Sequence, residues 1–260
     1  IRVALLAAGR TTMVHLLPDP HRAELLARLF IRGPRPIAPA DTALARAIAL
    51  RRSNRRPFTE RALPVKVRRA LVDAACLEGG ELTLLDHPGD LDALAALLRH
   101  AEHLQSEDPA FRAELARWTV VNGTRDDGVP AVAGGPRPEP GSLLTLRHYE
   151  VGPAGSPERP YERQPLVAVL SSYTDTPLAQ VRAGQAMQRV LLTATNAGVS
   201  ASFLSQPVEI PATRAALRRM LGGQPYPQVV LRFGYGFTAP ATRRRAVETV
   251  TRQRTEEVTP

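Results

Sequence analysis

The residues best suited to chemistry form a short arginine-rich stretch, RRSNRRPF, at positions 51–58. A guanidinium fork bonds two phosphate oxygens at once, and Ser53 adds a hydroxyl donor between the two arginine pairs. The stretch could therefore bind a small phosphorylated cofactor or a nucleic-acid backbone. Alternatively, Arg51 and Arg52 cap the carbonyls of a helix end while the second pair is solvated. Charge alone does not choose between a phosphate site and a capped helix end.

Positive charge is concentrated around this stretch. The chain has 34 basic and 25 acidic residues, a formal net charge of +9. Nine of the basic residues fall between Arg46 and Arg69, where Glu60 is the one acidic residue, so this segment carries +8. Such a concentration indicates a local site rather than a globally basic nucleic-acid binder. Phe58 is the only aromatic residue available in this segment for base stacking, so a nucleic-acid-binding module ranks third among the functional hypotheses.

Other catalytic motifs are absent from the sequence, which has no Gly-x-Gly-x-x-Gly, Walker or Gly-x-Ser-x-Gly pattern. His100 and His103, beside Glu102, could hold a metal ion, but the wet face of an amphipathic helix explains them better. Cys76 falls on the apolar side of its predicted helix and is interpreted as an inert core thiol. A chain with this arginine cluster and no such motif fits an enzyme whose cofactor carries the chemistry.

Hydrophobic periodicity predicts alternating helices and strands around these residues. Asp41 is expected to cap the helix that delivers the arginine cluster, and Gly9 and Gly198 are expected to stop two others. Together the elements predict an α+β (α/β layered) fold. Helices are expected at 20–29, 42–52, 65–78, 89–105, 107–118 and 177–198, and strands at 11–18, 81–86, 165–172 and 226–236.

Proline and glycine mark the expected connections. Residues 32–41 contain three prolines and predict a linker, while the Gly/Pro-rich residues 123–142 predict a lid loop. The tail from Thr238 is basic and is expected to be extended.

The single cysteine excludes an internal disulfide and favours a reducing, cytoplasmic location. No run of 18 apolar residues is present in the sequence, so a membrane span is not expected. The chain opens on Ile1 in what resembles the middle of a helix, and we expect that a segment precedes it.

A weak internal repeat links the two ends of the chain. The sequence RVALLAAGRTTMVHLLPDP resembles RVLLTATNAGVSASFLSQP from Arg189, and each copy places a proline nine residues after a helix-ending glycine. Related segments, HRAELLARL and TRAALRRML, then follow. The repeat predicts two related halves packed face to face.

Several of these motifs together resemble the FMN-dependent nitroreductase family. RRSNRRPF followed by LPVKVRRALVDAA is similar to the family's opening signature. AGQAMQRVLLTATNAGVSASFLSQP is similar to its long helix and flavin-edge segment, and PQVVLRFGYG with RRRAVETV to its closing strand and basic tail. The order and spacing most resemble the Acg-like branch, in which two nitroreductase-like halves are fused.

The resemblance implies a division of the chain. Residues 1–33 would be the remnant of a first half, 34–40 a linker, 41–250 the main half and 251–260 a tail. The branch normally has an Asn-(Ser/Thr)-Gln-Pro-Trp stretch in its first half. This stretch is absent here, and its expected position lies upstream of Ile1.

The resemblance also assigns residues to the FMN phosphate. Arg51, Arg52 and Ser53 match the positions that hold the phosphate and ribityl chain. Arg243 and Arg244 fall where the family's tail adds phosphate contacts, although a solvated basic run explains the tail equally well.

A second set matches the flavin ring. Arg55 matches the basic residue near the pyrimidine edge, where a cation would stabilise the anionic reduced flavin. Phe203, Leu204, Ser205 and Gln206 match the segment whose backbone N–H groups face flavin N5, with Ser205 as the expected donor.

The implied function is an FMN-binding oxidoreductase. NAD(P)H would reduce the flavin at N5 and leave, and a small electron acceptor such as a nitroaromatic or quinone would then be reduced in a ping-pong scheme. The alternative is a flavin-sequestering stress protein with little turnover. No membrane partner is expected, and the protein would be either a monomer that mimics a dimer or a homodimer.

Overall fold

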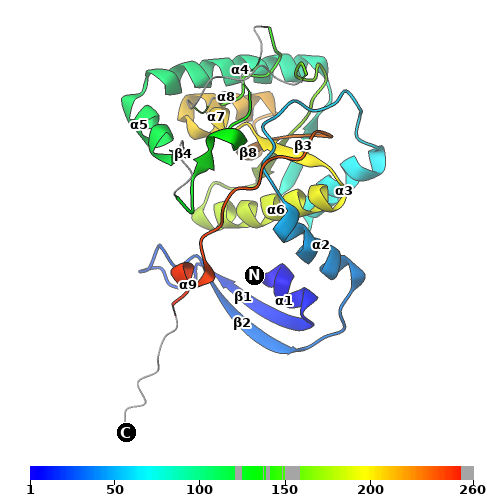
Figure 1. The fold of residues 1–260 in the computed structure, drawn as a ribbon. Coiled ribbons are helices and arrows are strands. Elements are labelled where there is room, and N and C mark those ends of the chain that lie inside the picture. Colours follow the sequence, from blue (N-terminus) through cyan, green and yellow to red (C-terminus); the bar gives the residue numbers. More distant parts are fainter. Residues whose placement is uncertain (121–124, 137, 139–140, 148, 150–158, 253–260) are drawn as a thin grey trace.

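The computed structural model describes residues 1–120, 125–136, 138, 141–147, 149 and 159–252. A larger body built on a four-stranded sheet lies above a small N-terminal module, and helix α2 (Pro39–Leu50) leads from one to the other (Figure 1). No helix in the described residues is long and apolar enough to cross a membrane.

The main sheet has the strand order β3-β6-β8-β7, and neighbouring strands pair antiparallel. A parallel bridge from Ser53 to Ala201 at the β7 edge gives the sheet its mixed character. The sequence RRSNRRPF therefore begins at the edge of the sheet. The strands are β3 (Glu81–Leu85), β6 (Leu166–Ser172), β7 (Ser200–Phe203) and β8 (Tyr226–Gly234).

Helices cover both faces of this sheet. Because successive side chains of a strand point to opposite faces, Ala168 and Leu170 of β6 pack with α3 (Val65–Cys76) and α6 (Pro177–Asn196). Val167 and Val169 pack on the other face with residues of α4 (Pro88–Glu107) and α8 (Pro211–Met220). Burial on both faces explains why β6 reads as a continuous apolar run. The layered α+β prediction is confirmed.

Short elements complete the fold. They are α5 (Pro109–Trp118), β4 (Thr119–Val120), β5 (Val129–Pro130), η1 (Ala131–Ala133), α7 (Gln206–Glu209) and α9 (Val247–Val250). Helix α9 corrects the expectation of a wholly extended tail. The predicted lid at 123–142 lies partly outside the described residues, which in that range are 125–136, 138 and 141–142.

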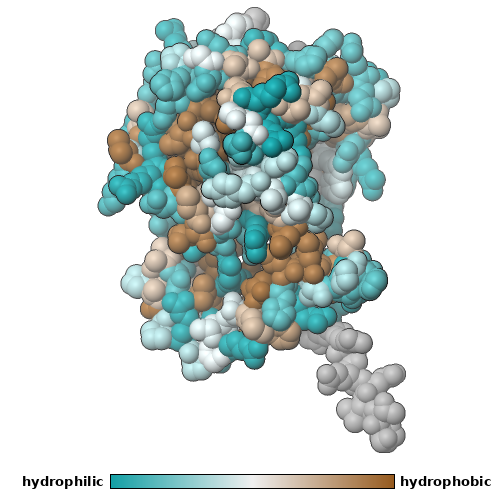
Figure 2. Space-filling model, turned by 180° about the vertical axis from the view of Figure 1, so that it is seen from behind, coloured by the Kyte–Doolittle hydropathy of each residue, from teal (hydrophilic) through white to brown (hydrophobic). Residues whose placement is uncertain are grey.

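The N-terminal module consists of α1 (Arg2–Ala7), β1 (Arg10–Leu16) and β2 (Ala27–Pro34). Strands β1 and β2 form an antiparallel pair. The predicted helix at 20–29 is wrong, because Ala27–Pro34 pairs with β1 and this hairpin overrides the helical spacing of the leucines. Apolar side chains gather on the surface of this module and at its junction with the larger body (Figure 2).

The internal repeat holds only in its first part. In both copies a helix ends at a glycine with positive φ, Gly9 at 70° and Gly198 at 69°, and a strand follows. The continuations then differ, because HRAELLARL leads into β2 whereas TRAALRRML lies in α8.

Three local predictions also need correction. The connection between β2 and α2 is confined to residues 35–38, shorter than the predicted linker, because β2 extends to Pro34. Ala38 is the N-cap residue of α2, and Asp41 lies in the first turn and pairs with Arg35 at 3.1 Å. Cys76, predicted in the core, is exposed because it is the last residue of α3.

Gly234 is required by the close approach of Phe58. A Cβ at Gly234 would lie 2.5–2.8 Å from three Phe58 side-chain atoms, and Phe58 is only 1% exposed. We expect Gly234→Ala to lower the free energy of unfolding by about 1–3 kcal/mol, because the core must shift to admit the methyl group. Urea denaturation measures this loss. Gly184→Ala is the control, since its Cβ would meet nothing within 4 Å in helix α6 and should not destabilise.

A bidentate ion pair fixes α8 to the turn before α6. Arg214 donates from Nη1 and Nη2 to the two Asp175 carboxylate oxygens at 2.6 and 2.7 Å. Hydrogen bonds from Arg214, aided by Gln228, lower the pKa of Asp175 from 3.8 to about 2. The stabilisation is therefore fully present above pH 3.8 and is lost as the pH falls toward 2.

Asp175→Asn should accordingly be less stable than the wild type at neutral pH, and the difference should shrink on acidification through this window. Because both side chains are partly exposed, we expect a difference of about 1 kcal/mol or less. Thermal unfolding of the two proteins between pH 7 and pH 2 measures it. A difference independent of pH would contradict the assignment.

Candidate functional site

The arginine-rich arm, residues 51–56, lies along the edge strand β7. Ser53 bridges to Ala201, and the Asn54 N–H donates to the Ala201 carbonyl at 2.8 Å. The Asn54 side chain is buried; its Nδ2 donates to the Phe237 carbonyl at 2.8 Å and its Oδ1 accepts from the Arg56 N–H at 3.1 Å. This buried amide fixes the arm between the sheet edge and the chain that follows β8.

The positive charges of Arg52 and Arg244 act on Arg51 at the start of the arm. The pKa of Arg51 is lowered by burial and then by the positive charges of Arg244 and Arg52. Among the described residues no carboxylate pairs with any of the three. Arg52 also caps α2, since its Nη1 donates to the Ala49 carbonyl at 2.7 Å. The helix-capping interpretation thus accounts for part of Arg52 and leaves the Arg51–Arg244 approach unexplained.

The three arginines of the basic tail, residues 243–245, do not all have the same kind of neighbour. Arg243 pairs with Asp126 at 3.8 Å, and Arg245 pairs with Asp127. Arg244 lies between them in the sequence, and its positive charge lowers the pKa of Arg51. Of the two predicted tail residues, Arg244 therefore joins the cluster and Arg243 is engaged elsewhere.

Arg55 lies at a separate small cavity of about 40 Å³. Its Nη1 donates to the Ala133 carbonyl at 3.0 Å, and its guanidinium lies over the Tyr149 ring, 4.7 Å from the centroid. The cavity is lined by Arg55, Leu146, Arg147, Tyr149, Ser202, Phe203, Ser205 and Gln206.

The predicted flavin-edge segment follows β7 directly. Phe203, Ser205 and Gln206 line the small cavity with Arg55, so the structure brings the two ring-end predictions together. Leu204 is fully buried, and its N–H donates to the Val230 carbonyl at 2.9 Å. The Leu204 N–H is therefore not available to a ligand. Among the described residues the Ser205 N–H has no acceptor.

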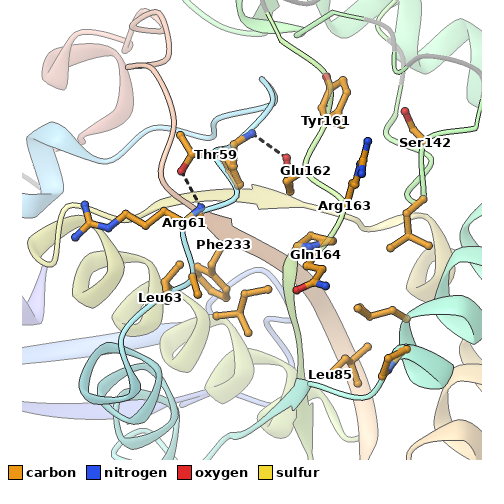
Figure 3. A pocket seen from close by; sticks show the side chains of 18 of the residues that line it. Thr59, Arg61, Leu63, Leu85, Ser142, Tyr161, Glu162, Arg163, Gln164 and Phe233 are labelled. Carbon is orange, nitrogen blue, oxygen red and sulfur yellow. Dashed lines mark hydrogen bonds between the residues drawn. The ribbon is translucent and has the colours of Figure 1, made fainter.

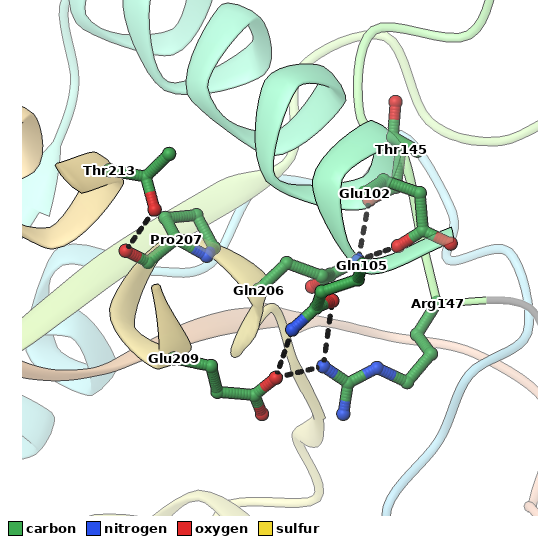
Figure 4. Close-up of polar contacts among 8 residues, drawn as sticks. All are labelled: Glu102, Gln105, Thr145, Arg147, Gln206, Pro207, Glu209 and Thr213. Carbon is green, nitrogen blue, oxygen red and sulfur yellow. Dashed lines mark hydrogen bonds and ion pairs between the residues drawn. The ribbon is translucent and has the colours of Figure 1, made fainter. Parts of the chain in front are cut away.

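A polar network that sequence reasoning missed borders the same cavity (Figure 4). Arg147 Nη2 contacts the carboxylate of Glu209 and lies 3.4 Å from Gln105 Oε1, and Gln105 Nε2 donates to Glu209 at 2.6 Å. The network joins α4, α7 and the segment that contains Arg147. Local sequence offers no signal for it, because its members lie far apart along the chain.

A buried ion pair braces the arm from the opposite side. Arg232 and Glu162 are nearly inaccessible and lie 3.1 Å apart. Arg232 Nη2 donates to the Arg56 carbonyl at 2.7 Å, and Glu162 Oε2 accepts from the Phe58 N–H at 2.8 Å. Burial lowers the pKa of Arg232, and the nearby Glu162 opposes this change. An arginine inside the apolar strand VVLRFG was the available sequence signal.

A larger cavity of about 820 Å³ lies elsewhere in the larger body (Figure 3). Phe58, Leu85, Glu162 and Phe233 contribute to its wall, and none of the ten predicted site residues does. The described residues also hold no group of three His, Cys, Asp or Glu side chains placed to bind a metal ion.

Comparison with known sequences shows the family to which the chain belongs. A Mycobacterium tuberculosis H37Rv protein, Rv3131, which bears the provisional name NAD(P)H nitroreductase, is 34% identical over 239 residues. The match covers 90% of this chain and 67% of the relative. The chain belongs to the nitroreductase family. A second relative from the same organism with a provisional nitroreductase name, acg, is 29% identical over 257 residues, 96% of this chain and 76% of its own.

Solved structures agree on the nitroreductase-like fold. A nitroreductase from Desulfovibrio desulfuricans, solved in complex with FMN, aligns with a TM-score of 0.50 at 14% identity. The alignment covers 82% of this chain and 96% of that one. Iodotyrosine deiodinase, solved with FMN and 3-iodo-L-tyrosine, aligns with a TM-score of 0.53 at 12% identity, over 82% of this chain and 99% of that one. No protein-family model matches this sequence.

Proposed function

We propose that this nitroreductase-family protein is an FMN-dependent NAD(P)H oxidoreductase that reduces a small electron-poor acceptor, such as a nitroaromatic or a quinone. The observation that carries the proposal is the convergence of Arg51, Arg52 and Arg244 without a carboxylate partner among the described residues. Like charges brought together at a half-buried site favour an anionic ligand, because a phosphate dianion would remove their mutual repulsion. The names of the relatives and the ligands of the solved structures support FMN as that ligand.

At the phosphate end, Arg51, Arg52 and Arg244 would bind the phosphate oxygens, and Ser53 would add a hydroxyl. Ser53 is held at the sheet edge by its bridge to Ala201, and the buried Asn54 fixes the backbone beside it. The arm is therefore ordered by contacts that do not involve the arginine side chains. Such preorganisation lowers the entropy lost when the ligand binds.

At the ring end, a bound flavin would accept a hydride at N5 and pass it on. Arg55 would stabilise the negative charge of the reduced ring, and the Ser205 N–H would orient the ring by donating to N5. The residue types fit this role, because one cavity is lined by a cation and by Ser205, whose N–H has no acceptor in the part of the chain that the structure describes. The cavity of about 40 Å³ is smaller than a ring system needs, so side chains that line it would have to move for the ring to enter.

The same closed cavity supports a second candidate function, a protein that holds flavin with little turnover. Tyr149 on Arg55 would limit the space for a nicotinamide or an acceptor beside the ring. Anaerobic mixing of the FMN-loaded protein with NADH or NADPH separates the two functions. The oxidoreductase proposal predicts bleaching of the flavin absorbance and its return when a quinone is added in a second mixing step. Bound flavin that neither nucleotide reduces would contradict it and favour storage.

A further inference from the structure

The cavity of about 820 Å³ lies at one end of the main sheet. Strand β3 ends there at Leu85, β6 begins at Leu166, and Phe233 lies near the end of β8. The volume falls within the range of roughly 300–1,000 Å³ that is typical of small-molecule sites. Because none of the ten predicted site residues contributes to the wall, the proposed FMN-dependent activity leaves this cavity without a role.

Part of the cavity wall is apolar. Leu63 and Phe233 belong to the core on one face of the sheet, whereas Leu85 and Leu91 belong to the core on the other face. The cavity therefore lies where the two cores meet at the sheet end. A ligand with an apolar body would remove more of this surface from water.

Polar contacts hold another part of the wall in place. The Tyr161 hydroxyl donates to the Arg55 carbonyl at 3.0 Å. Glu162 pairs with the buried Arg232 and accepts from the Phe58 N–H. Tyr161, Glu162 and Phe58 all line the cavity, so this side of it is preformed and little order has to be gained when a ligand binds.

The charges on the wall are only partly compensated. Six charged residues line the cavity: Arg61, Arg68, Asp86, Asp92, Glu162 and Arg163. Arg68 pairs with Asp86, and Glu162 pairs with Arg232. The three that remain have no ion-pair partner in the part of the chain that the structure describes: Arg61, Asp92 and Arg163. Positive charge predominates among these three, which favours an anionic ligand.

Arg163 is the residue best placed to bind that anion. Arg61 lies over the Tyr235 ring, 4.6 Å from its centroid, whereas the Arg163 guanidinium has no hydrogen bond, ion pair or ring contact among the described residues. Arg163 lies on the side of the cavity near Ser142, and Leu85 lies on the opposite side (Figure 3). The cavity thus offers an available guanidinium on one side and an apolar wall on the other.

We propose that this cavity binds an organic anion with an apolar body, of the class of medium-chain carboxylates. The carboxylate pairs with the Arg163 guanidinium, and the chain lies against Leu63, Leu85 and Leu91. The proposal goes beyond the function proposed above and does not depend on it, because the cavity shares no wall residue with the predicted flavin site.

The test measures the binding of octanoate, of uncharged 1-octanol and of the shorter butyrate by isothermal titration calorimetry at pH 7.5. We expect the wild type to bind octanoate about 10-fold or more tightly than butyrate, because each buried methylene group adds affinity. Octanoate should also bind about fivefold more tightly than 1-octanol, because only octanoate pairs with Arg163. Arg163→Gln should lose this preference for the charged ligand. Arg112→Gln should keep it, since Arg112 is an exposed residue of α5 that does not line the cavity.

A bulky substitution locates the site. Leu91→Trp fills the cavity from α4 and should weaken the binding of octanoate and 1-octanol about 10-fold or more. Unchanged binding in this variant would place the ligand on another apolar surface and overturn the proposal. If Leu91→Trp does not fold, Arg163→Gln still decides, because it changes an exposed side chain.

The other outcomes are equally decisive. No binding of octanoate by the wild type, equal affinities for octanoate and 1-octanol, or a preference for octanoate that persists in Arg163→Gln would each overturn the proposal. FMN affinity is measured separately on the same wild-type protein. Failure of the octanoate site with FMN still bound would therefore leave the proposed function intact.

Discussion

The double substitution Arg51→Ala, Arg244→Ala is expected to weaken FMN binding by about 100-fold or more. Each guanidinium would make charge-assisted hydrogen bonds to the phosphate, and each such bond contributes about 1.5–3 kcal/mol. The two side chains come from distant parts of the sequence, one just after α2 and the other after β8, and they raise the local positive potential together. Isothermal titration calorimetry with FMN measures the loss.

The ligand-free variant provides an internal control. Because Arg244 and Arg51 repel each other, their removal should leave the unfolding midpoint unchanged or slightly higher. Arg46→Ala removes one positive charge from the exposed face of α2 and should change FMN affinity less than about threefold, since exposed charges are strongly screened. Equal losses in Arg46→Ala and in the double variant would indicate a general charge effect and contradict a built phosphate site.

Arg232→Met is expected to destabilise the protein by about 3–5 kcal/mol, because it leaves the Glu162 carboxylate buried without its partner. The loss has two further parts. The hydrogen bond from Arg232 to the Arg56 carbonyl is lost, and the stacking of the guanidinium on Phe58, 4.1 Å from the ring centroid, disappears. Urea denaturation followed by circular dichroism measures the change.

The double variant Arg232→Met, Glu162→Gln identifies the cause. It removes both charges, while the amide oxygen that replaces the carboxylate can still accept from the Phe58 N–H, so part of the stability should return. A loss below about 1 kcal/mol in the single variant, or no recovery in the double variant, would show that the pair is not essential to the fold. The Arg232–Glu162 pair holds residues 56–58 in place. A substitution in this pair that destabilises the protein less than Arg232→Met is therefore also expected to reduce FMN affinity.

The larger body of the fold was predictable because its elements carry strong local signals. Buried β6 is a continuous apolar run, and α6 ends at Gly198, whose φ of 69° suits glycine. The helix predicted at 20–29 is wrong because the helical spacing of its leucines is overridden by the hairpin with β1. Pairing with a distant strand is not encoded in local periodicity.

The candidate site was predictable in part. The arm and the segment after β7 were recognised through the family resemblance, and the structure places them side by side through the Ser53–Ala201 bridge. The roles of Glu162 and Arg147 could not be found this way. These roles depend on partners more than 40 residues away, which only the fold brings together.

The most direct test of the central claim is a calorimetric comparison of FMN with riboflavin, which has the same ring but lacks the phosphate. If Arg51, Arg52 and Arg244 hold the phosphate, the wild type should bind FMN about 100-fold or more tightly than riboflavin, and alanine at the three positions should abolish this preference. Similar affinities for the two ligands, or no binding of either, would contradict the assignment of the arginine cluster as a flavin phosphate site.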